Sequence, residues 1–305
     1  MKILNLFLVC TFAFVYANAQ QNPNVKKVHF DKEKWVEYIE GNMPLVISVP
    51  HGGTMVVDSL PIRNCKGAVG VRDGNTIELA LAIQGYFQKT YHLTPHIIIS
   101  HLSRKHLDQN REFENGASCG NKQVERPWYT FHNWVDSALN LATADGKKAM
   151  YIDLHGHGHK NQRLEVGYNL TKEELNRILN DNFNEKAKAH SLANLLKMDS
   201  SLNFKDLIFG DKAFGTILVN NGLAATPSKQ DNVPAEEEAF FSGGDNTRRF
   251  TGKKYPNVFG LQIESNGAAR KIENRAKTAK GIADAVVEYL NLYTKNEIKA
   301  SKNNN

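Results

Sequence analysis

Three histidines alternate with glycines at the end of one apolar segment of this chain. Residues 149–152 are apolar, and they run into Asp153, His155, His157 and His159. Imidazole is the commonest metal ligand in proteins, and a neighbouring carboxylate can fix its tautomer. The pattern therefore indicates a metal site, with a polar loop of surface histidines as the alternative.

A second apolar segment ends in the same way. Residues 44–49 are largely apolar and are followed by His51, Gly52 and Gly53. The carboxyl ends of strands are where open α/β sheets present reactive groups to a ligand. Two strand ends that both carry His-Gly are harder to explain by chance than one, so we predict that His51 and His155 bind the same metal ion.

The third ligand must come from another segment, because a catalytic zinc ion takes three protein ligands and keeps one position for water. Thr54 stands where a His-x-x-Glu arrangement would place a carboxylate, so Asp73 is preferred. Its alternative role is to cap the helix that follows. Glu78 is a weaker candidate because it should point along the surface of that helix. His157 and His159 are also weaker, because we expect alternate residues leaving a strand to point in opposite directions.

Two further polar segments could act on a substrate. Residues 103–111 are dense in hydrogen-bond donors, and an Arg there could hold a carboxylate by two parallel bonds; a solvated charged loop is the alternative. Glu264 closes the apolar segment 258–264. A buried carboxylate needs a partner or a function, and a general base acting on metal-activated water would be one; a loop-pairing residue is the alternative.

The segments that carry these residues alternate between strand-like and helix-like patterns, which predicts an α/β layered fold. Thr171 and Glu174 form a capping box at one helix start. Residues 221–256 read as a long loop, of the kind that forms lids or binding walls. The predicted strands are 45–49, 96–100, 149–154, 164–168, 214–219 and 258–264, and the predicted helices are 75–89, 123–142, 171–195 with a break, and 271–293.

The N-terminus has the pattern of a secretory signal. Lys2 is followed by the apolar residues 3–16 and by Ala-Asn-Ala at 17–19, which matches an A-x-A cleavage site. The apolar stretch is too short to span a bilayer comfortably. We therefore predict that residues 1–19 are removed and that the protein is secreted or periplasmic, with no membrane attachment afterwards.

The remaining chain predicts one α/β domain over residues 20–294 and a disordered tail over 295–305. The net charge is +6, without a long basic run before the tail, which argues against nucleic-acid binding. Cys65 and Cys119 could form one disulfide in an oxidising compartment, although their spacing alone does not establish it. The oligomeric state stays open.

In these motifs and in their order, the chain resembles the N-formylglutamate amidohydrolase family, which is itself similar to zinc carboxypeptidases and aspartoacylase-type deacylases. Each motif is short, but together they extend over roughly residues 44–275. The matching pieces are 49–53, Arg72-Asp73 with Glu78-Leu79, 107–111, 153–157, 242–244 with Thr247, and 262–264 with Arg270.

The resemblance implies a three-layer α/β sandwich with a mixed central sheet, of the zinc-exopeptidase or phosphorylase-hydrolase kind, with one zinc ion. Carried over position by position, it implies three metal ligands, one general base and a set of residues around the substrate. These are His51, Asp73 and His155 as ligands, Glu264 as base, Asn110 and Arg111 at a substrate carboxylate, and Arg270, Gly243 and Gly244 in the pocket wall.

The implied activity is zinc-dependent hydrolysis of an amide in a small carboxylated N-acyl amino acid, similar to N-formylglutamate, or in a short peptide. Two alternatives stay open: an exported carboxypeptidase-like or γ-glutamyl peptide hydrolase, and a non-catalytic binding protein on the same fold. Two departures from the family bear on the substrate. Members that act on formylglutamate are mostly cytoplasmic, and Arg249 stands where closer relatives would have His.

Overall fold

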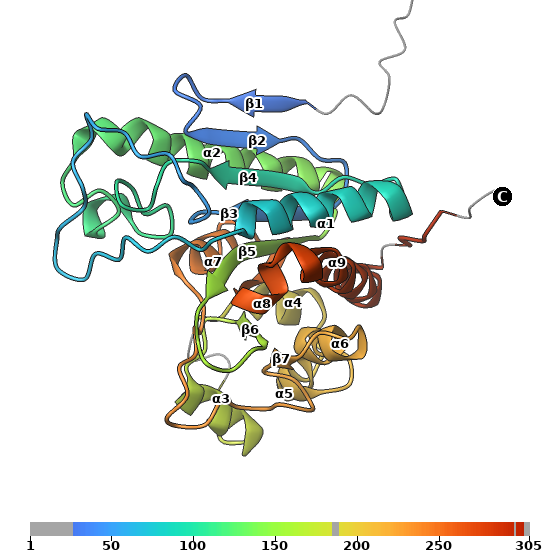
Figure 1. Ribbon diagram of the computed structural model, residues 1–305. Helices are drawn as coiled ribbons and strands as arrows, with labels where there is room; N and C mark the ends of the chain where they lie inside the picture. The colour runs from blue at the N-terminus through green and yellow to red at the C-terminus, as the bar shows by residue number, and fades with distance from the viewer. Residues whose placement is uncertain (1–26, 185–188, 296, 302–305) are drawn as a thin grey trace, which may run out of the picture.

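The computed structural model describes residues 27–184, 189–295 and 297–301, so the predicted signal segment lies outside the described residues. The strands are β1 (Val28–Phe30), β2 (Val36–Ile39), β3 (Leu45–Val49), β4 (His96–Ser100), β5 (Ala149–His157), β6 (Leu164–Gly167), β7 (Ala225–Thr226) and β8 (Val258–Asn266). They form one 8-stranded sheet in the order β1-β2-β4-β3-β5-β8-β6-β7, which runs from top to bottom in Figure 1.

The centre of this sheet is parallel. β4, β3, β5 and β8 run in the same direction, whereas β2 is antiparallel to β4 and β6 is antiparallel to β8. The mixed sheet of the predicted α/β sandwich is therefore confirmed. Because the parallel strands point the same way, the residues that end β3, β5 and β8 lie along one edge of the sheet.

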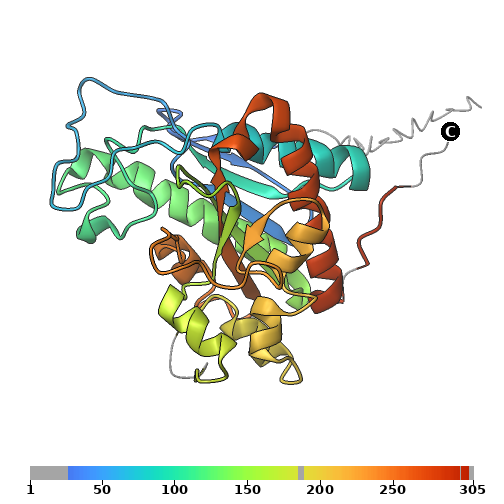
Figure 2. The same ribbon diagram turned by 60° about the horizontal axis from the view of Figure 1, so that its bottom comes forward.

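Helices cover both faces of the sheet, and Figure 2 shows α1 and α9 side by side. The helices are α1 (Thr76–Tyr91), α2 (Glu125–Ala142), α3 (Lys172–Leu179), α4 (Ala193–Met198), α5 (Phe204–Phe209), α6 (Phe214–Asn220), α7 (Asp245–Phe250), α8 (Gly267–Arg270) and α9 (Ile272–Thr294). The predicted capping box of Thr171 and Glu174 is present at the start of α3.

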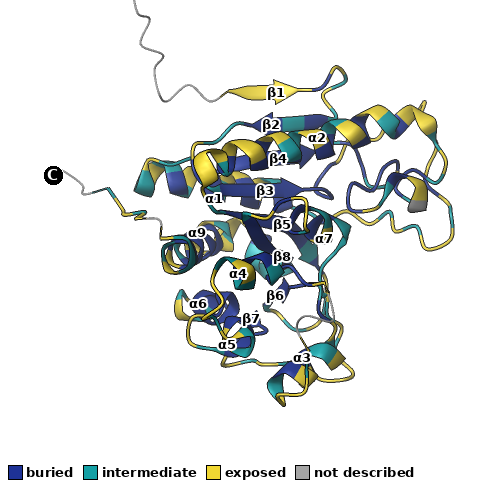
Figure 3. Ribbon diagram, turned by 180° about the vertical axis from the view of Figure 1, so that it is seen from behind, coloured by how far each residue is buried: buried dark blue, intermediate teal, exposed yellow. Residues whose placement is uncertain are grey.

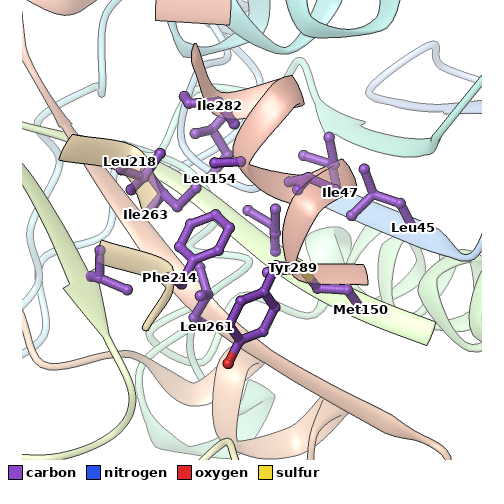
Figure 4. Close-up of a cluster of buried hydrophobic side chains, with 14 of the residues drawn as sticks. Leu45, Ile47, Met150, Leu154, Phe214, Leu218, Leu261, Ile263, Ile282 and Tyr289 are labelled. Atoms are coloured by element: carbon purple, nitrogen blue, oxygen red, sulfur yellow. The ribbon is translucent and has the colours of Figure 1, made fainter. Parts of the chain in front are cut away.

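Alternate side chains of β5 face different layers, and this places the polar residues. Met150, Ile152 and Leu154 belong to the core beneath α1 and α9, part of which is drawn in Figure 4. Tyr151 belongs to the second core, beneath α2 and Phe250 of α7, on the side seen in Figure 3. Because alternate residues of a strand share a face, the odd-numbered Asp153, His155 and His157 continue the α2 side of the sheet.

One predicted strand is wrong. Residues 214–219 form most of helix α6, which packs against α9 with Phe214, Ile217 and Leu218 buried. A short apolar run is equally suitable for a buried strand and a buried helix, so periodicity cannot separate the two. Gly215 permits the close packing, because a Cβ there would lie 1.9 Å from the carbonyl oxygen of Pro227.

One segment predicted as a loop contains regular structure. The predicted loop 221–256 contains strand β7 and helix α7. Within the predicted tail, the structure describes Lys295 and residues 297–301, where Ile298 N donates to Asn291 Oδ1 and Ser301 N donates to Thr90 O, each at 2.9 Å. These residues are therefore held against α9 and α1. Among the described residues, no helix has the length and apolar character needed to cross a membrane.

The segment that leads to Asp73 is fastened to the loop after β4 and to the loop before α2. Cys65 and Cys119 form a disulfide with Cα atoms 5.3 Å apart, so the bond that the sequence left open is present. Arg63 donates to the carbonyl oxygens of Val69, Arg104 and Gly116. These links restrict the motion of residues 61–72 and so help to hold Asp73 in place.

The buried His96, at the start of β4, should make the folding stability of the protein depend on pH. Its buried Nδ1 accepts hydrogen bonds from Tyr38 Oη at 2.9 Å and Gly41 N at 3.0 Å. Burial lowers its pKa from 6.5 to about 4. A lowered pKa means that the contribution of neutral His96 is present above pH 6.5 and lost as the pH falls through 4. We expect a loss of about 2 to 3 kcal/mol between pH 7 and pH 4.5.

Urea unfolding at the two pH values measures this effect. Between pH 7 and pH 4.5, the unfolding free energy of His96→Gln should fall by about 2 to 3 kcal/mol less than that of the wild type. The reason is that the variant lacks the group that takes up a proton on unfolding. His29→Gln, at an exposed histidine, is the control and should keep the wild-type dependence. If the unfolding free energy fell equally with pH in the wild type and in His96→Gln, the pH dependence would not come from His96.

Candidate metal centre and active site

His51, Asp73 and His155 converge at the edge where β3 and β5 end. Their ligand-type atoms all lie within 4.8 Å of one another, and all three side chains are buried. His51 follows β3, His155 lies near the end of β5, and Asp73 lies in the loop before α1. The structure thus brings together the three residues that the sequence predicts as metal ligands.

Asp73 presents one oxygen to both histidines. Its Oδ2 lies 3.5 Å from His51 Nδ1 and 3.2 Å from His155 Nδ1, and it accepts a hydrogen bond from Gly156 N at 3.1 Å. The alternative role of Asp73 as a helix cap is not observed, because Asn75 is the N-cap residue of α1. Its carboxylate is directed instead at the space between the two imidazoles.

A second carboxylate lies behind each histidine. His51 Nε2 is 2.6 Å from Asp108 Oδ1, and His155 Nε2 is 2.8 Å from Asp153 Oδ2. These contacts fix a proton on each Nε2 and direct each Nδ1 toward Asp73. Metal-ligating histidines commonly have this arrangement, with the far nitrogen bonded to a carboxylate. The sequence indicated Asp153 as a support but not Asp108, which lies within the segment 103–111.

The electrostatics of this cluster fit a bound cation. Burial alone would lower the pKa of His155, but the carboxylates of Asp153 and Asp73 hold it well above its usual range. Burial alone would raise the pKa of Asp73, but both histidines keep it below its usual range. His51 Nδ1 is buried without a hydrogen-bond partner among the described residues. Two imidazoles and one carboxylate form a donor set that zinc accepts, so the residues present fit a divalent ion.

Asp108 gives a testable prediction, because it orients His51 and is itself held by Arg104 Nε at 2.9 Å. Asp108→Asn should lower the affinity for zinc by about 10- to 100-fold. The measurement is a competition titration against a coloured chelator, with circular dichroism to verify folding. Asp136→Asn, at a surface residue paired with Lys254, is the control and should leave the affinity unchanged. An unchanged affinity in Asp108→Asn would remove the assigned role.

Glu264 lies beside the three presumed ligands. In the sheet it is paired with His155 on one side and with Glu165 on the other. Gln262 Nε2 donates to its Oε1 at 2.9 Å, whereas its buried Oε2 has no hydrogen-bond partner among the described residues. Burial raises its pKa to about 8, and the carboxylates of Asp73, Glu165 and Asp153 add to this against the opposing effect of His155. The cluster therefore contains a poised carboxyl group with one uncommitted oxygen.

Asn110 and Arg111 are placed differently from each other. Asn110 Nδ2 lies 3.2 Å from His155 Nε2, and its Oδ1 accepts a hydrogen bond from Asn246 N at 2.8 Å. The amide oxygen is thus used within the protein, whereas Nδ2 lies against the protonated Nε2 of His155 and cannot donate to it. The implied contact of Asn110 with a substrate carboxylate stays a prediction. Arg111 is half exposed, with NH1 3.6 Å from Asp245 Oδ2, and it can still meet a substrate.

The residues implied to form the pocket wall make close contacts with other parts of the protein. A Cβ at Gly244 would lie 2.3 Å from Asn110 Nδ2, and one at Gly243, whose φ is 120°, would lie 2.8 Å from Asn169 Nδ2. Arg270 lies on the face of β5 opposite His155, where a Cβ at Gly156 would overlap its guanidinium group. Arg270 is therefore buried within the protein, whereas Gly243 and Gly244 are partly exposed. The implied place of these residues in the pocket wall stays a prediction.

Arg270 holds two strand ends together. Its guanidinium group donates to the carbonyl oxygens of Ser265, in β8, and His157, in β5. Burial lowers its pKa, although Asp73 and Glu264 act in the opposite direction. Its two terminal nitrogens thus bond to backbone carbonyls, whereas its buried Nε has no hydrogen-bond partner among the described residues.

His157 and His159 lie on the same side as the main cluster, which corrects the sequence expectation. β5 extends to His157, and residues two apart in a strand share a face. Together with Glu165 they form a second group whose ligand-type atoms lie within 4.8 Å of one another. Sequence reasoning missed Glu165; the available signal was a charged residue inside the short apolar strand 164–168.

The fold is a mixed α/β sheet flanked by helices, and comparisons with known proteins agree. Among solved structures, the chain is similar to the N-formylglutamate amidohydrolase from Ralstonia eutropha JMP134, with a TM-score of 0.52 and 12% identity over 83% of this chain and 95% of that one. The resemblance inferred from the motifs is thus matched at the level of the fold.

A second structure, described as a "putative metallopeptidase" from Shewanella denitrificans OS217, has a TM-score of 0.30 and 10% identity over 88% of this chain and 84% of that one. No protein-family model matches the chain, and no curated protein matches it in sequence.

Proposed function

We propose that this protein is a zinc-dependent hydrolase that cleaves an amide bond of a small carboxylated N-acyl amino acid. One zinc ion would be held by His51, Asp73 and His155, with Glu264 as the general base. The observation that carries the proposal is the convergence of these four side chains from separate segments at one edge of the sheet. The fold shared with an amidohydrolase supports the same reaction class.

The chemistry follows from the uncommitted oxygen of Glu264. When bound, zinc supplies Lewis-acid polarisation of the carbonyl group and of a water molecule. Glu264 Oε2 accepts a proton as the water oxygen bonds to the carbonyl carbon, and it returns the proton to the nitrogen as the C–N bond breaks. Gln262 holds Oε1, which keeps the carboxylate oriented during both transfers. A cation nearby also favours the ionised form that Glu264 needs as a base.

Substrate recognition is assigned to Arg111. Its half-exposed guanidinium group lies directly after Asn110, which contacts His155. A guanidinium group can hold a carboxylate by two parallel hydrogen bonds. The present partner of Arg111, Asp245, is 3.6 Å away and would be exchanged for the substrate carboxylate. We retain a secreted or periplasmic location as part of the proposal, on the pattern of residues 1–19.

A peptide hydrolase is a second candidate, favoured by a hollow beside the site. The hollow, with a volume of about 730 Å³, is bounded by Gly53 and Arg72, which are near neighbours of His51 and Asp73 in the chain. Val56, Ile62 and Val71 line it and are exposed. An apolar hollow with cationic residues at its border suits a substrate longer than a formyl amino acid.

The proposed function is tested by a hydrolysis screen. Zinc-loaded protein is incubated with N-formyl, N-acetyl and longer N-acyl amino acids, and with short α- and γ-linked peptides, and the released amine is measured. We expect turnover of at least one amide class, lost with a chelator and restored by zinc. Activity that resists the chelator would contradict the metal-dependent scheme. Zinc binding without hydrolysis of any substrate would favour the non-catalytic binding protein.

A further inference from the structure

His157, His159 and Glu165 extend the polar surface beyond Glu264, on the side away from the presumed zinc ligands. Glu165 is directly paired with Glu264 across the β6–β8 ladder. Residues paired in this way have Cβ atoms about 4.5 to 5.5 Å apart on one face of the sheet. His159 Nδ1 lies 2.7 Å from Glu165 Oε1. The order across the edge is therefore His155, Glu264, Glu165 and His159.

Most polar atoms of this second group are already occupied. His157 Nε2 is 2.9 Å from the carbonyl oxygen of Arg163, and its Nδ1 accepts a hydrogen bond from His159 N at 3.1 Å. Glu165 Oε2 accepts a hydrogen bond from Phe241 N at 2.8 Å, and its Oε1 is used by His159. A metal ion would have to displace several of these bonds, so the group is not arranged as a second metal centre.

One atom remains available. His159 Nε2 has no hydrogen-bond partner within the part of the chain that the structure describes, and the side chain is 20% exposed. Glu165, which is 1% exposed, fixes the proton on Nδ1 of His159 and leaves Nε2 as a hydrogen-bond acceptor. The ring stacks on Phe241 with centroids 4.6 Å apart, and Phe241 is itself 45% exposed. An acceptor held by Glu165, with an apolar ring beside it, is thus partly exposed next to the residue that pairs with Glu264.

We infer that His159 binds an N–H group on the acyl part of the substrate, so that the preferred substrates are aminoacyl or peptidyl amino acids. The inference rests on the proposed function and narrows its substrate class. Arg111 takes the carboxylate near Asn110, whereas His159 lies beyond Glu264, so the group at His159 belongs to the other side of the cleaved bond. An α-amino group or a peptide N–H there donates to Nε2, and the negative charge of Glu165 favours such a donor. Formyl and simple acyl groups lack it.

The test compares two substrates that differ in one group. Alanylglutamate carries an α-amino group that N-propionylglutamate lacks, and the two are otherwise alike. For the zinc-loaded wild type, we expect kcat/KM to be about 10- to 100-fold higher for alanylglutamate, the range for a hydrogen bond to a charged group. His159→Ala should lose this preference through a fall for alanylglutamate alone, with unchanged zinc content.

Two further variants separate binding from structure. His159→Gln retains an acceptor oxygen and should recover part of the preference, and Glu165→Gln should weaken it because the tautomer of His159 is no longer fixed. His101→Ala is the matched control, since His101 also pairs with a glutamate, Glu37, at 2.7 Å. It should keep the wild-type preference.

Three results would overturn the inference alone: a wild type that hydrolyses both substrates equally, an equal loss for both in His159→Ala, or two zinc ions in the wild type and one in His159→Ala. A zinc-loaded wild type that hydrolyses neither substrate nor any other amide in the screen would count against the proposed function itself. The two failures are therefore distinguishable.

Discussion

The Glu264→Gln variant should bind zinc as the wild type does and lose turnover by about 10²- to 10⁴-fold, the usual contribution of a general base. Glutamine keeps the shape of the side chain and the contact with Gln262, but it cannot accept a proton from water. Burial of Glu264, together with its acidic neighbours, raises its pKa to about 8. Removing this carboxyl group should therefore not destabilise the fold.

The measurement is steady-state hydrolysis together with zinc content. Glu288→Gln is the matched control, since Glu288 lies on the exposed side of α9, and it should retain full activity. KM should change little in Glu264→Gln, because the residue acts on water and on the leaving nitrogen rather than on the substrate carboxylate. A fully active Glu264→Gln enzyme would show that the base has been assigned to the wrong residue.

Replacing His155 by alanine should abolish both zinc binding and activity. The substitution removes one of three ligands, and it leaves Asp73 and Asp153 as buried carboxylates without their shared cationic partner. Loss of a partner to a buried charge is costly, so thermal unfolding should be measured alongside. The expected result is a folded protein without zinc, whose activity added zinc does not restore at concentrations sufficient for the wild type.

Asp73→Asn gives an independent version of the same test. Asparagine can occupy the same space near both Nδ1 atoms, but it carries no charge, so zinc affinity should fall while the contact with Gly156 N persists. His29→Ala, at an exposed histidine, should retain both zinc and activity. If either ligand variant kept stoichiometric zinc at its original affinity, these side chains would not be the ligands.

The sequence located the central strands well because local patterns determine them. The predicted bounds of β3 and β4 agree with the structure, and each is a largely apolar segment buried on both faces. A similar apolar segment at residues 214–219 was wrongly predicted as a strand. There, the helix depends on packing against α9 and on the close approach of Gly215 to Pro227. Strands β1, β2 and β7 were not predicted, since they are short and lie toward the margins of the sheet.

The residues of the candidate site that lie at strand ends could be predicted from the sequence. Those placed by loops were harder to predict. His51, His155 and Glu264 follow from apolar strands with polar ends, and parallel strands bring such ends to one edge. The contacts of Asp108 with His51, and of Asn110 with His155, depend on how the loop after β4 folds back, which no local pattern encodes. The orientation of Arg270 could not be predicted from the sequence, because it depends on the space that Gly156 leaves for the guanidinium group.

The most direct test of the account is the position of zinc in crystals of the protein, found by anomalous scattering at the zinc absorption edge. We expect one strong peak, bordered by Nδ1 of His51, Nδ1 of His155 and the carboxylate of Asp73. No peak there in zinc-loaded crystals, or a peak held instead by His157, His159 and Glu165, would contradict it.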